Sequence, residues 1–464
     1  MGINNCPICL EKQRKIDDLT AEVERLRAAL GREQRKLKNG LFGSSTPSGK
    51  LPVKSNTEEK EKKPRGARAG HPGQGRKSEV GKSGHDVGES SSVQMDADDI
   101  CPDCGGRLRD KGHETREVLE SQPVKVKRTI YHLSKKYCPH CRKTHKTKVP
   151  GVLPRSLYGN QLIANAAVMH YLNGIPMGRI CEQTGVGPGS LVEIFHRLNH
   201  LLARIPDRLI EEYRKSPVKH ADETGWRTDG KNGYAWLFAT PSISIFQFGK
   251  SRSAAVPQAV FGKEPVPGVL VVDRYSAYNQ LPCRIQYCYA HLLREVTDLE
   301  KDFPDNPEVK TFVATVAPML SLAMGLRSQQ ISDEIFYRKA KKLKKDIQAA
   351  MTSPARNLGI RRIQDIFTAH ENRLYHWADD RRVPADNNTA ERDLRPSVIA
   401  RKTSFGSITD AGARIRSTLT SILLSMKKQD LDVASQLKAA LDILAKDIKQ
   451  DPFPLLFPNP APDH

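Results

Sequence analysis

The stretch 268–275, GVLVVDRY, contains four consecutive apolar residues followed by an acid. Such an unbroken apolar run suits a β-strand covered on both faces, as in the parallel part of an α/β sheet. Asp273 would then lie where the strand ends, at the rim of the sheet. Upstream, Asp222 ends the extended run VKHAD in a comparable way. If the two strands are neighbours, their carboxylates converge.

The residues from Pro217 to the buried strand predict three strands and one helix. PVKHADETGWRT reads as a strand, DGKNG as a turn, YAWLFATP and SISIFQFG as strands, and SAAVPQAVFG as a helix before the buried strand. We therefore expect an α/β domain in which a three-strand meander is followed by a helix and a buried strand.

Two carboxylates at one sheet edge repel each other unless a cation lies between them, and Mg²⁺ bound by oxygen ligands is the usual resolution. A third acid would complete such a site, and Glu391 in 386–396, DNNTAERDLRP, is a candidate. The same stretch also reads as a helix start, with Asn388 as N-cap and Glu391 in the position of a capping-box acid. Glu391 is therefore either a metal ligand or a cap.

Charge and length bound the class of protein. A chain of 464 residues with 38% hydrophobic content predicts two to four folded units. The formal charge is +21, and residues 121–150 hold nine Lys and Arg and no acid. Such a surface favours a polyanion such as DNA or RNA, the alternative being a merely soluble basic surface. No run of about 18 apolar residues and no signal peptide are evident, so we expect a cytoplasmic protein that does not enter a membrane.

Six of the nine cysteines form CxxC pairs, which favours zinc over disulfides in a chain without a secretion signal. The second and third pairs are separated by the β-prone VKVKRTIYHL, so two turns can bring four thiolates around one ion. These four predicted zinc ligands are Cys101, Cys104, Cys138 and Cys141. Cys6 and Cys9 have no evident second pair, and their role stays open.

The rest of the chain divides by composition. Apolar residues spaced by three and four within 10–38 predict a coiled coil for self-association, or else an amphipathic helix packed on its own protein. Residues 158–205 suggest a helix-turn-helix, or three helices used for support. The predicted parts are a coiled-coil helix with a CxxC at 1–42, a basic linker at 43–99, a zinc unit at 100–152, a helical segment at 153–210, a catalytic domain at 211–425 and a C-terminal helix and tail at 426–464.

Several of these motifs together resemble the insertion sequence 66 family of bacterial transposases. The resemblance rests on ADETGW, VVDRYSAY, CYAHL, DNNTAERDLRP and RKTSFGSITDAGAR, with LFGSSTPS and the paired CxxC motifs upstream. The sequence departs from the family in two details: Asp393 stands where Ala is commoner, and CYAH replaces the more usual CWAH.

The resemblance implies a ribonuclease-H-like catalytic domain with a helical insertion at about 292–380. It implies a DDE triad of Asp222, Asp273 and Glu391 that binds Mg²⁺ or Mn²⁺, cuts the element's terminal inverted repeats and joins them to target DNA. It also implies a nucleoid-associated homo-oligomer with possible accessory proteins encoded by the same element. Candidate DNA contacts are Lys135, Lys136, Arg142, Lys143, Arg395, Arg401 and Lys402.

Some alternatives stay open at this point. Cys288 and His291 either shape the active site from behind the acids or form a hydrogen-bonded core pair, and ERDLR is also consistent with a solvated helix face. The acids alone are equally consistent with a nuclease that performs no strand transfer. A zinc-containing DNA-binding repressor is the alternative outside enzymes.

Overall fold

The computed structural model describes residues 126–140, 142–146 and 149–458, together with scattered helical positions between residues 15 and 26. These residues belong to one compact unit, and a second unit, Pro52–Pro123, lies outside them. The described part of the chain is mixed α/β with a majority of helix.

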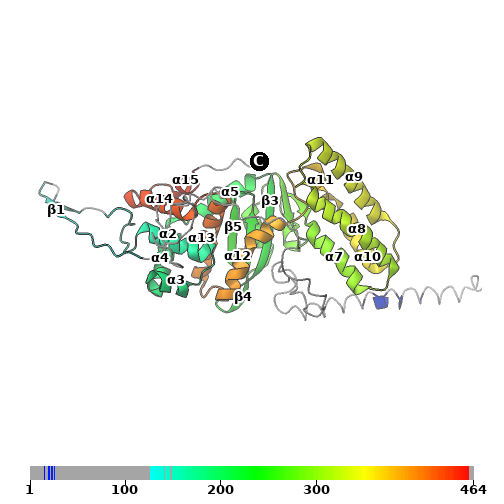
Figure 1. The fold of residues 1–464 in the computed structure, drawn as a ribbon, viewed down its shortest axis with the longest axis horizontal. Coiled ribbons are helices and arrows are strands. Elements are labelled where there is room, and N and C mark those ends of the chain that lie inside the picture. The colour runs from blue at the N-terminus through cyan, green and yellow to red at the C-terminus, as the bar shows by residue number, and fades with distance from the viewer. Residues whose placement is uncertain are drawn as a thin grey trace, which may run out of the picture. The chain divides into compact units, whose positions relative to one another are not determined.

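A five-stranded sheet forms the centre of this part of the chain (Figure 1). Its strands are β3 (Val218–Thr228), β4 (Lys231–Ala239), β5 (Ser244–Gly249), β6 (Val269–Val272) and β7 (Arg284–Tyr287), in the order β5-β4-β3-β6-β7. β3, β4 and β5 pair antiparallel, whereas β6 and β7 run parallel to β3. Helix α6 (Ala255–Phe261) joins the two halves. The expected order of meander, helix and buried strand is confirmed.

One expectation about this sheet was wrong. Asp222 lies inside β3 and not at its end, because β4 pairs with β3 as far as Thr228. β6 is shorter and pairs with β3 only up to His220, which is opposite Val271. Continuing this register by two residues brings Asp222 level with Asp273. The two acids therefore meet at the edge where β6 ends, even though β3 continues.

Alternating side chains of the meander build two apolar layers. Trp236 and Phe238 join the larger core, which includes Tyr213 of α5 (Ile205–Lys215) and Phe261 of α6. Ala235, Leu237 and Ala239 face the opposite way, into a second core shared with helices α12 (Asn388–Ser404) and α13 (Asp410–Lys428). Figure 1 shows α12 lying across the strands. Asp222 and Trp226 share this second face, so α12 packs on the side of the sheet from which Asp222 points.

The free edge of the sheet at β5 is sealed by three serines of α13. The backbone N–H groups of Ser244, Phe246 and Phe248 donate to the hydroxyls of Ser425, Ser421 and Ser417 at 2.9, 2.8 and 3.0 Å. The serines are four residues apart and so lie on one face of the helix. The strand thus has hydrogen-bond partners on both sides.

The helical segment before the sheet packs against the C-terminal helices. It consists of α2 (Asn160–Ala167), the π-helical turn η3 (Val168–Leu172), α3 (Met177–Thr184), α4 (Pro188–Leu201) and α5 (Ile205–Lys215), while α14 (Val433–Lys446) and α15 (Pro452–Leu456) follow α13. α2 lies on α14, and α13 contacts η3, α4 and α5. Buried Arg416 of α13 lies 2.9 Å from Nε2 of His170. The helices that precede the sheet and the helices at the C-terminal end therefore share one core.

A run of helices separates β7 from α12. It comprises α7 (Tyr289–Asp302), α8 (Pro307–Leu326), α9 (Asp333–Thr352), α10 (Leu358–Ala369), the 3-10 turn η5 (Glu371–Arg373) and α11 (His376–Asp379), and another 3-10 turn, η4 (Ser276–Tyr278), precedes β7. The helical character expected for the insertion at about 292–380 is confirmed, although α10 ends at Ala369 and only the short elements η5 and α11 follow before α12. In the described part of the chain, α8 alone is long and apolar enough to cross a membrane. It packs on α7 and α9, so this is weak evidence for a membrane segment.

Two predicted segments are described only in part. A β-hairpin of β1 (Lys135–Cys138) and β2 (Lys143–Lys146) occupies the end of the predicted zinc unit, with Cys138 opposite Lys143. The described positions of the predicted coiled coil are helical, and Leu19, Val23 and Leu26 are 60%, 45% and 57% exposed. These apolar side chains therefore have little cover from their own chain.

Candidate active site

Asp222 lies in β3 with 8% of its surface exposed. Its Oδ1 accepts a hydrogen bond of 2.9 Å from the backbone N–H of Glu223. Burial raises the pKa of Asp222 well above its usual range, and the charges of Glu223, Asp273 and Glu391 raise it further. The parallel register of β3 and β6 brings Asp273 level with Asp222, and Glu391 lies on the helix that packs on the same face of the sheet as Asp222.

Asp273 follows directly after β6 and is half-buried. Its Oδ1 accepts a 2.9 Å hydrogen bond from the N–H of Tyr275, which turns the chain away from the sheet. The other oxygen has no hydrogen bond within the described part of the chain. Asp273 thus presents one carboxylate oxygen at the edge where β6 ends.

Glu391 does not lie at the capping-box position of α12 in the structure. Helix α12 is capped by Asn387 and not by Asn388, and no side chain accepts a capping hydrogen bond there. Glu391 is therefore one residue beyond the capping-box position, and its buried Oε1 has no hydrogen-bond partner among the residues that the structure describes. Burial raises its pKa, and Asp386 adds to the rise while Arg294 and Arg395 oppose it.

The predicted N-cap, Asn388, is the first residue of α12, and the side chain of the N-cap residue Asn387 binds the sheet and makes no capping hydrogen bond. Its Nδ2 donates to the carbonyl of Ala221 at 2.8 Å, so its Oδ1 faces Nδ1 of His220 at 2.9 Å and accepts from it. The backbone N–H of Asn387 donates to Sγ of Cys288 at 3.2 Å. Asn387 is 1% exposed and joins the start of α12 to the strand that carries Asp222.

Cys288 and His291 lie behind the acids. Cys288 is buried at the start of α7, and its N–H donates to the carbonyl of Val272 at 2.8 Å, next to Asp273. Burial raises the pKa of its thiol to about 12, so it stays protonated. Burial lowers the pKa of His291, whereas the charge of Asp273 raises it, and within the described part of the chain Nδ1 of His291 has no hydrogen-bond partner.

The carboxylates of Asp222, Asp273 and Glu391 are suitable ligands for a divalent cation, but they are not arranged around a single ion position in the structure. Carboxylate oxygens suit Mg²⁺, and an orphaned buried oxygen such as Oε1 of Glu391 requires a cationic or donor partner. Across residues 149–458 and the shorter described stretches, no three His, Cys, Asp or Glu side chains lie close enough to hold one ion. Binding would therefore have to draw the three acids closer together.

The predicted basic residues of α12 divide into two kinds. Arg395 and Lys402 are exposed and make no hydrogen bond or ion pair with the described residues. Arg401 instead donates to the carbonyl of Gly225 and to the hydroxyl of Thr224 at 2.5 and 3.2 Å, which ties α12 to β3. Arg294 of α7, which the sequence reasoning missed, acts on Glu391 alongside Arg395.

Sequence reasoning also missed Glu223, which lies on the other face of β3 from Asp222. The Nη2 and Nε groups of Arg252 donate to Oε1 of Glu223 at 2.7 and 3.2 Å, and the hydroxyl of Tyr278 donates to Oε2 at 2.7 Å. Burial raises its pKa, and Asp273 raises it further. The signal was a second acid directly beside Asp222 in the same extended run.

Both departures from the family pattern have partners in the fold. Asp393 forms a buried ion pair with Lys428 at 2.5 Å and accepts from the hydroxyl of Ser244 at 2.7 Å. The hydroxyl of Tyr289, in CYAH, donates to the carbonyl of Leu374 at 2.7 Å. Asp393 therefore fixes α12 to α13 and β5, and Tyr289 fixes α7 to the helical insertion.

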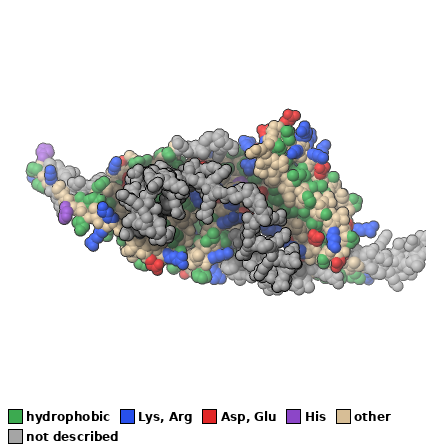
Figure 2. Space-filling model, in the orientation of Figure 1, with side chains coloured by type: hydrophobic (Ala, Val, Ile, Leu, Met, Phe, Trp, Pro, Cys, Tyr) green, Lys and Arg blue, Asp and Glu red, His purple; other side chains and the backbone are tan. Residues whose placement is uncertain are grey.

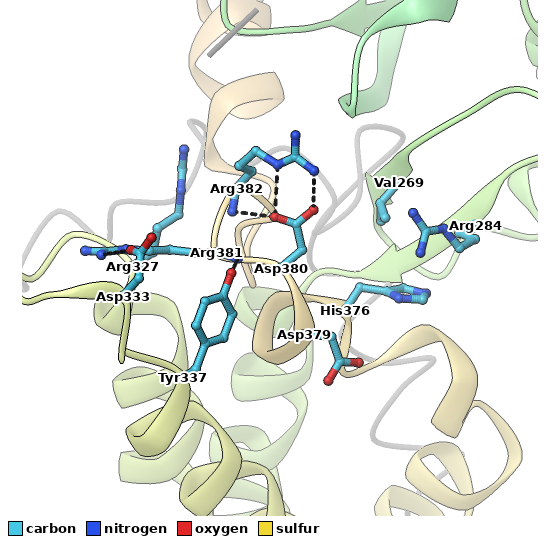
Figure 3. Close-up of a pocket in the computed structure, with 10 residues that line it drawn as sticks. All are labelled: Val269, Arg284, Arg327, Asp333, Tyr337, His376, Asp379, Asp380, Arg381 and Arg382. Carbon is cyan, nitrogen blue, oxygen red and sulfur yellow. Dashed lines mark hydrogen bonds and ion pairs between the residues drawn. The ribbon is translucent and has the colours of Figure 1, made fainter. Parts of the chain in front are cut away.

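A cavity of about 770 Å³ lies elsewhere, at the opposite ends of the parallel strands (Figure 3). Val269 and Arg284, the first residues of β6 and β7, line it together with residues of the helical insertion. Figure 3 shows the guanidinium of Arg382 paired with the carboxylate of Asp380 there. Because Asp273 follows the last residue of β6, this cavity is separate from the three acids.

Little of the predicted zinc and DNA-contact set upstream can be located. Cys101, Cys104 and Cys141 lie outside the described residues, and Cys138 ends β1. Lys136 and Arg142 are exposed on either side of the hairpin turn, where Arg142 adopts a positive φ of 54°. Lys135 and Lys143 lie within β1 and β2. Figure 2 shows Lys and Arg at several separate places on the face in view.

Comparison with known proteins identifies the family. The family model described as Transposase IS66 family matches residues 155–415, which is more than half of the chain and includes all three acids. The chain belongs to this family. A second match, described as the zinc-finger binding domain of transposase IS66, covers residues 98–142 and all four predicted zinc ligands. The two matches follow one another along the chain.

Two relatives from Sinorhizobium fredii (strain NBRC 101917 / NGR234) are similar to this IS66 transposase. Uncharacterized protein y4qI is 25% identical over 349 residues, which is 65% of this chain and 63% of the relative. Uncharacterized protein y4jD is 24% identical over 388 residues, which is 74% of each. The chain thus spans less than two thirds of y4qI.

Proposed function

We propose that the protein is a DDE transposase, which cuts the ends of a bacterial insertion sequence and joins them to target DNA. The observation that carries this proposal is the buried, unpartnered Oε1 of Glu391, on a helix that packs on the face of the sheet from which Asp222 points. Family membership supplies the transposase class, and the proposal adds the reaction and its residues.

The sheet supports a ribonuclease-H-like fold for this domain, which would extend over 211–425 with the helical insertion at about 292–380. Three antiparallel strands followed by two parallel ones, in the order β5-β4-β3-β6-β7, bring two acids from neighbouring strands to one edge. A helix from much later in the chain adds the third. The other domain limits stay as the sequence predicted them.

Asp222, Asp273 and Glu391 would hold Mg²⁺, or Mn²⁺ in its place. The metal, when bound, supplies activation of the attacking oxygen and stabilisation of the leaving 3′ oxygen. Asn387 and Cys288 would hold the start of α12 and the end of β6 in register, so that the three carboxylates approach one another. Arg294 and Arg395 would neutralise phosphate charge beside Glu391.

The N-terminal part would deliver this domain to the element's ends. The match to a zinc-finger domain supports Zn²⁺ at Cys101, Cys104, Cys138 and Cys141, with Lys135, Lys136, Arg142 and Lys143 on DNA phosphates. The exposed Leu19, Val23 and Leu26 support self-association through the predicted coiled coil. The protein would act in the cytoplasm on chromosomal DNA, with accessory proteins of the same element as possible partners.

The test compares cleavage of plasmid-borne element ends by the full-length protein and by Glu391→Gln, Asp222→Asn and Asp273→Asn. Each change removes one carboxylate charge, so cleavage and strand transfer should fall by about 100-fold or more while DNA binding persists. Losses from two changes together should not add, because the acids act as one unit. Mn²⁺ is tried beside Mg²⁺, since it can partly rescue a damaged site.

Glu371→Gln is the matched control, because Glu371 is an exposed acid of the helical insertion. It should cleave normally. Near-normal cleavage by Glu391→Gln, together with loss in Asp386→Asn, would mean that the third acid is misassigned. Cleavage without joining would indicate a nuclease, and metal-independent binding with no nicking would indicate a repressor.

A further inference from the structure

The end of α12 presents two large apolar side chains to solvent. Phe405 is 79% exposed and Ile408 is 90% exposed. Phe405 also adopts the left-handed conformation, with φ of 58°, which is a genuine outlier for a bulky residue. An exposed aromatic held in an unfavourable backbone conformation needs a reason beyond the packing of its own chain.

The segment that carries these side chains is firmly held. The backbone N–H of Ser407 donates to the carbonyl of Arg227 at 2.9 Å, and its carbonyl accepts from the N–H of Asp229 at 3.0 Å. The indole N–H of Trp226 donates to the Ser407 hydroxyl at 3.1 Å. Gly406, at φ of 129°, approaches so closely that a Cβ there would lie 2.2 Å from the carbonyl oxygen of Arg227. The turn of the β3–β4 hairpin therefore fixes the segment 405–408, called the apolar tip below.

The exposed face of α12 leads from Glu391 to this tip and is basic. The residues Arg392, Arg395, Ile399 and Lys402 are all exposed and follow one another at steps of three or four, so they form one stripe along the helix. No acid lies on this stripe. Asp393, the acid within this stretch, points inward to its ion pair with Lys428.

We propose that this stripe carries the phosphate backbone of the terminal-repeat DNA away from the active site, and that the apolar tip contacts or unstacks a base at its far end. The inference rests on the proposed function, since it takes Glu391 as the point of cleavage. Exposed cations such as Arg395 and Lys402, which form no ion pair with the described residues, suit phosphates, and exposed apolar side chains beside them suit base faces. The charge of the stripe favours DNA over a protein partner.

The length of α12 gives the expected position of the contact. Fourteen residues separate Glu391 from Phe405, which is about 21 Å along a helix at roughly 1.5 Å per residue. At about 3.4 Å per base step, this corresponds to roughly six base pairs. The tip should therefore meet the DNA about six base pairs from the cleavage point.

The experiment uses the full-length protein without added divalent metal, so that cleavage plays no part. Duplexes taken from the terminal repeat carry a single 2-aminopurine at successive positions, and its fluorescence reports unstacking. We expect an increase near the sixth position with the native protein and loss of this increase in Phe405→Ala. Leu322→Ala is the matched control, because Leu322 is a half-exposed apolar residue of α8.

The stripe is tested by the salt dependence of affinity for the same duplexes. Arg395→Gln and Lys402→Gln should each reduce the slope of log affinity against log salt by about 0.9, as expected for one lost phosphate contact. Lys341→Gln, at an exposed position of α9, should leave the slope unchanged.

Three results would overturn the inference. They are an unchanged fluorescence profile in Phe405→Ala, unchanged salt slopes in the stripe variants, and loss of self-association in Phe405→Ala and Ile408→Ala with the DNA signal intact. The last result would assign the tip to a second copy of the chain. None of these three measurements involves cleavage. If Glu391→Gln cleaves normally, the proposed reaction is refuted, but the fluorescence profile, the salt slopes and the self-association are unaffected by that outcome.

Discussion

Replacing Asn387 by alanine tests whether one buried amide positions the third acid. The change deletes two side-chain hydrogen bonds, to His220 at 2.9 Å and to Ala221 at 2.8 Å, at a position that is 1% exposed. Leaving two buried groups unsatisfied costs roughly 1–3 kcal/mol each, so we expect a loss of about 2–6 kcal/mol of unfolding free energy. Because the same bonds tie α12 to β3, Glu391 should also move relative to Asp222.

Asn357→Ala separates these two effects. Asn357 is also a buried helix N-cap, 3% exposed, and its Oδ1 accepts from the N–H groups of Gly359 and Ile360 at 2.8 and 3.3 Å. It lies in the helical insertion, so its loss should cost similar stability without moving an acid. Stability is measured by urea unfolding, and cleavage at temperatures where both variants are equally folded.

At matched folded fraction we expect Asn387→Ala to cleave about 100-fold more slowly than the native protein, which is the effect expected from a displacement of about 1 Å in an active site. Asn357→Ala should cleave within about twofold of native. Equal activity of the two variants would refute the positioning role of Asn387.

The remaining predictions concern other parts of the chain. Cys138→Ser should release zinc and lower DNA affinity, as measured by metal analysis and filter binding, and a zinc-free protein that still binds DNA normally would contradict this. Leu26→Lys should weaken self-association in sedimentation, because it places a charge in a packed seam. Replacing Lys135 and Lys136 by Gln should flatten the salt dependence of DNA affinity. Burial lowers the pKa of His170 in the folded protein from 6.5 to about 4. The contribution of this histidine to the free energy of unfolding should therefore be fully present above about pH 6.5, and about 3 kcal/mol of it should be lost as the pH falls towards 4. This loss should be smaller in His170→Gln.

Much of the catalytic sheet could be predicted from the sequence because its signals are local. The apolar run 269–272 and the turn at Asp229–Gly230 fix the strands, and the acids stand beside them. The position of Asp222 within β3 could not be predicted, because it depends on where a separate strand, β6, stops pairing. Strand ends follow from tertiary pairing, which leaves little trace in the strand's own residues.

The start of α12 shows a second limit. Two adjacent asparagines, Asn387 and Asn388, both suit a cap, and capping rules choose between them only when their side chains have no other partner. Here His220 and Ala221, more than 160 residues upstream, engage Asn387. The pairing of Glu223 with Arg252 and Tyr278 was out of reach for the same reason, since it joins three segments distant in sequence.

The three serines of α13 that accept from β5 also bear on what happens when the chain is interrupted. A product ending before residue 410 would retain every strand of the sheet but leave the N–H groups of Ser244, Phe246 and Phe248 without acceptors. Such an edge is a template for pairing with another chain. Shortened copies of this protein should therefore co-aggregate with one another, and could draw partly synthesised full-length chains into the same deposits before α13 has emerged to protect them.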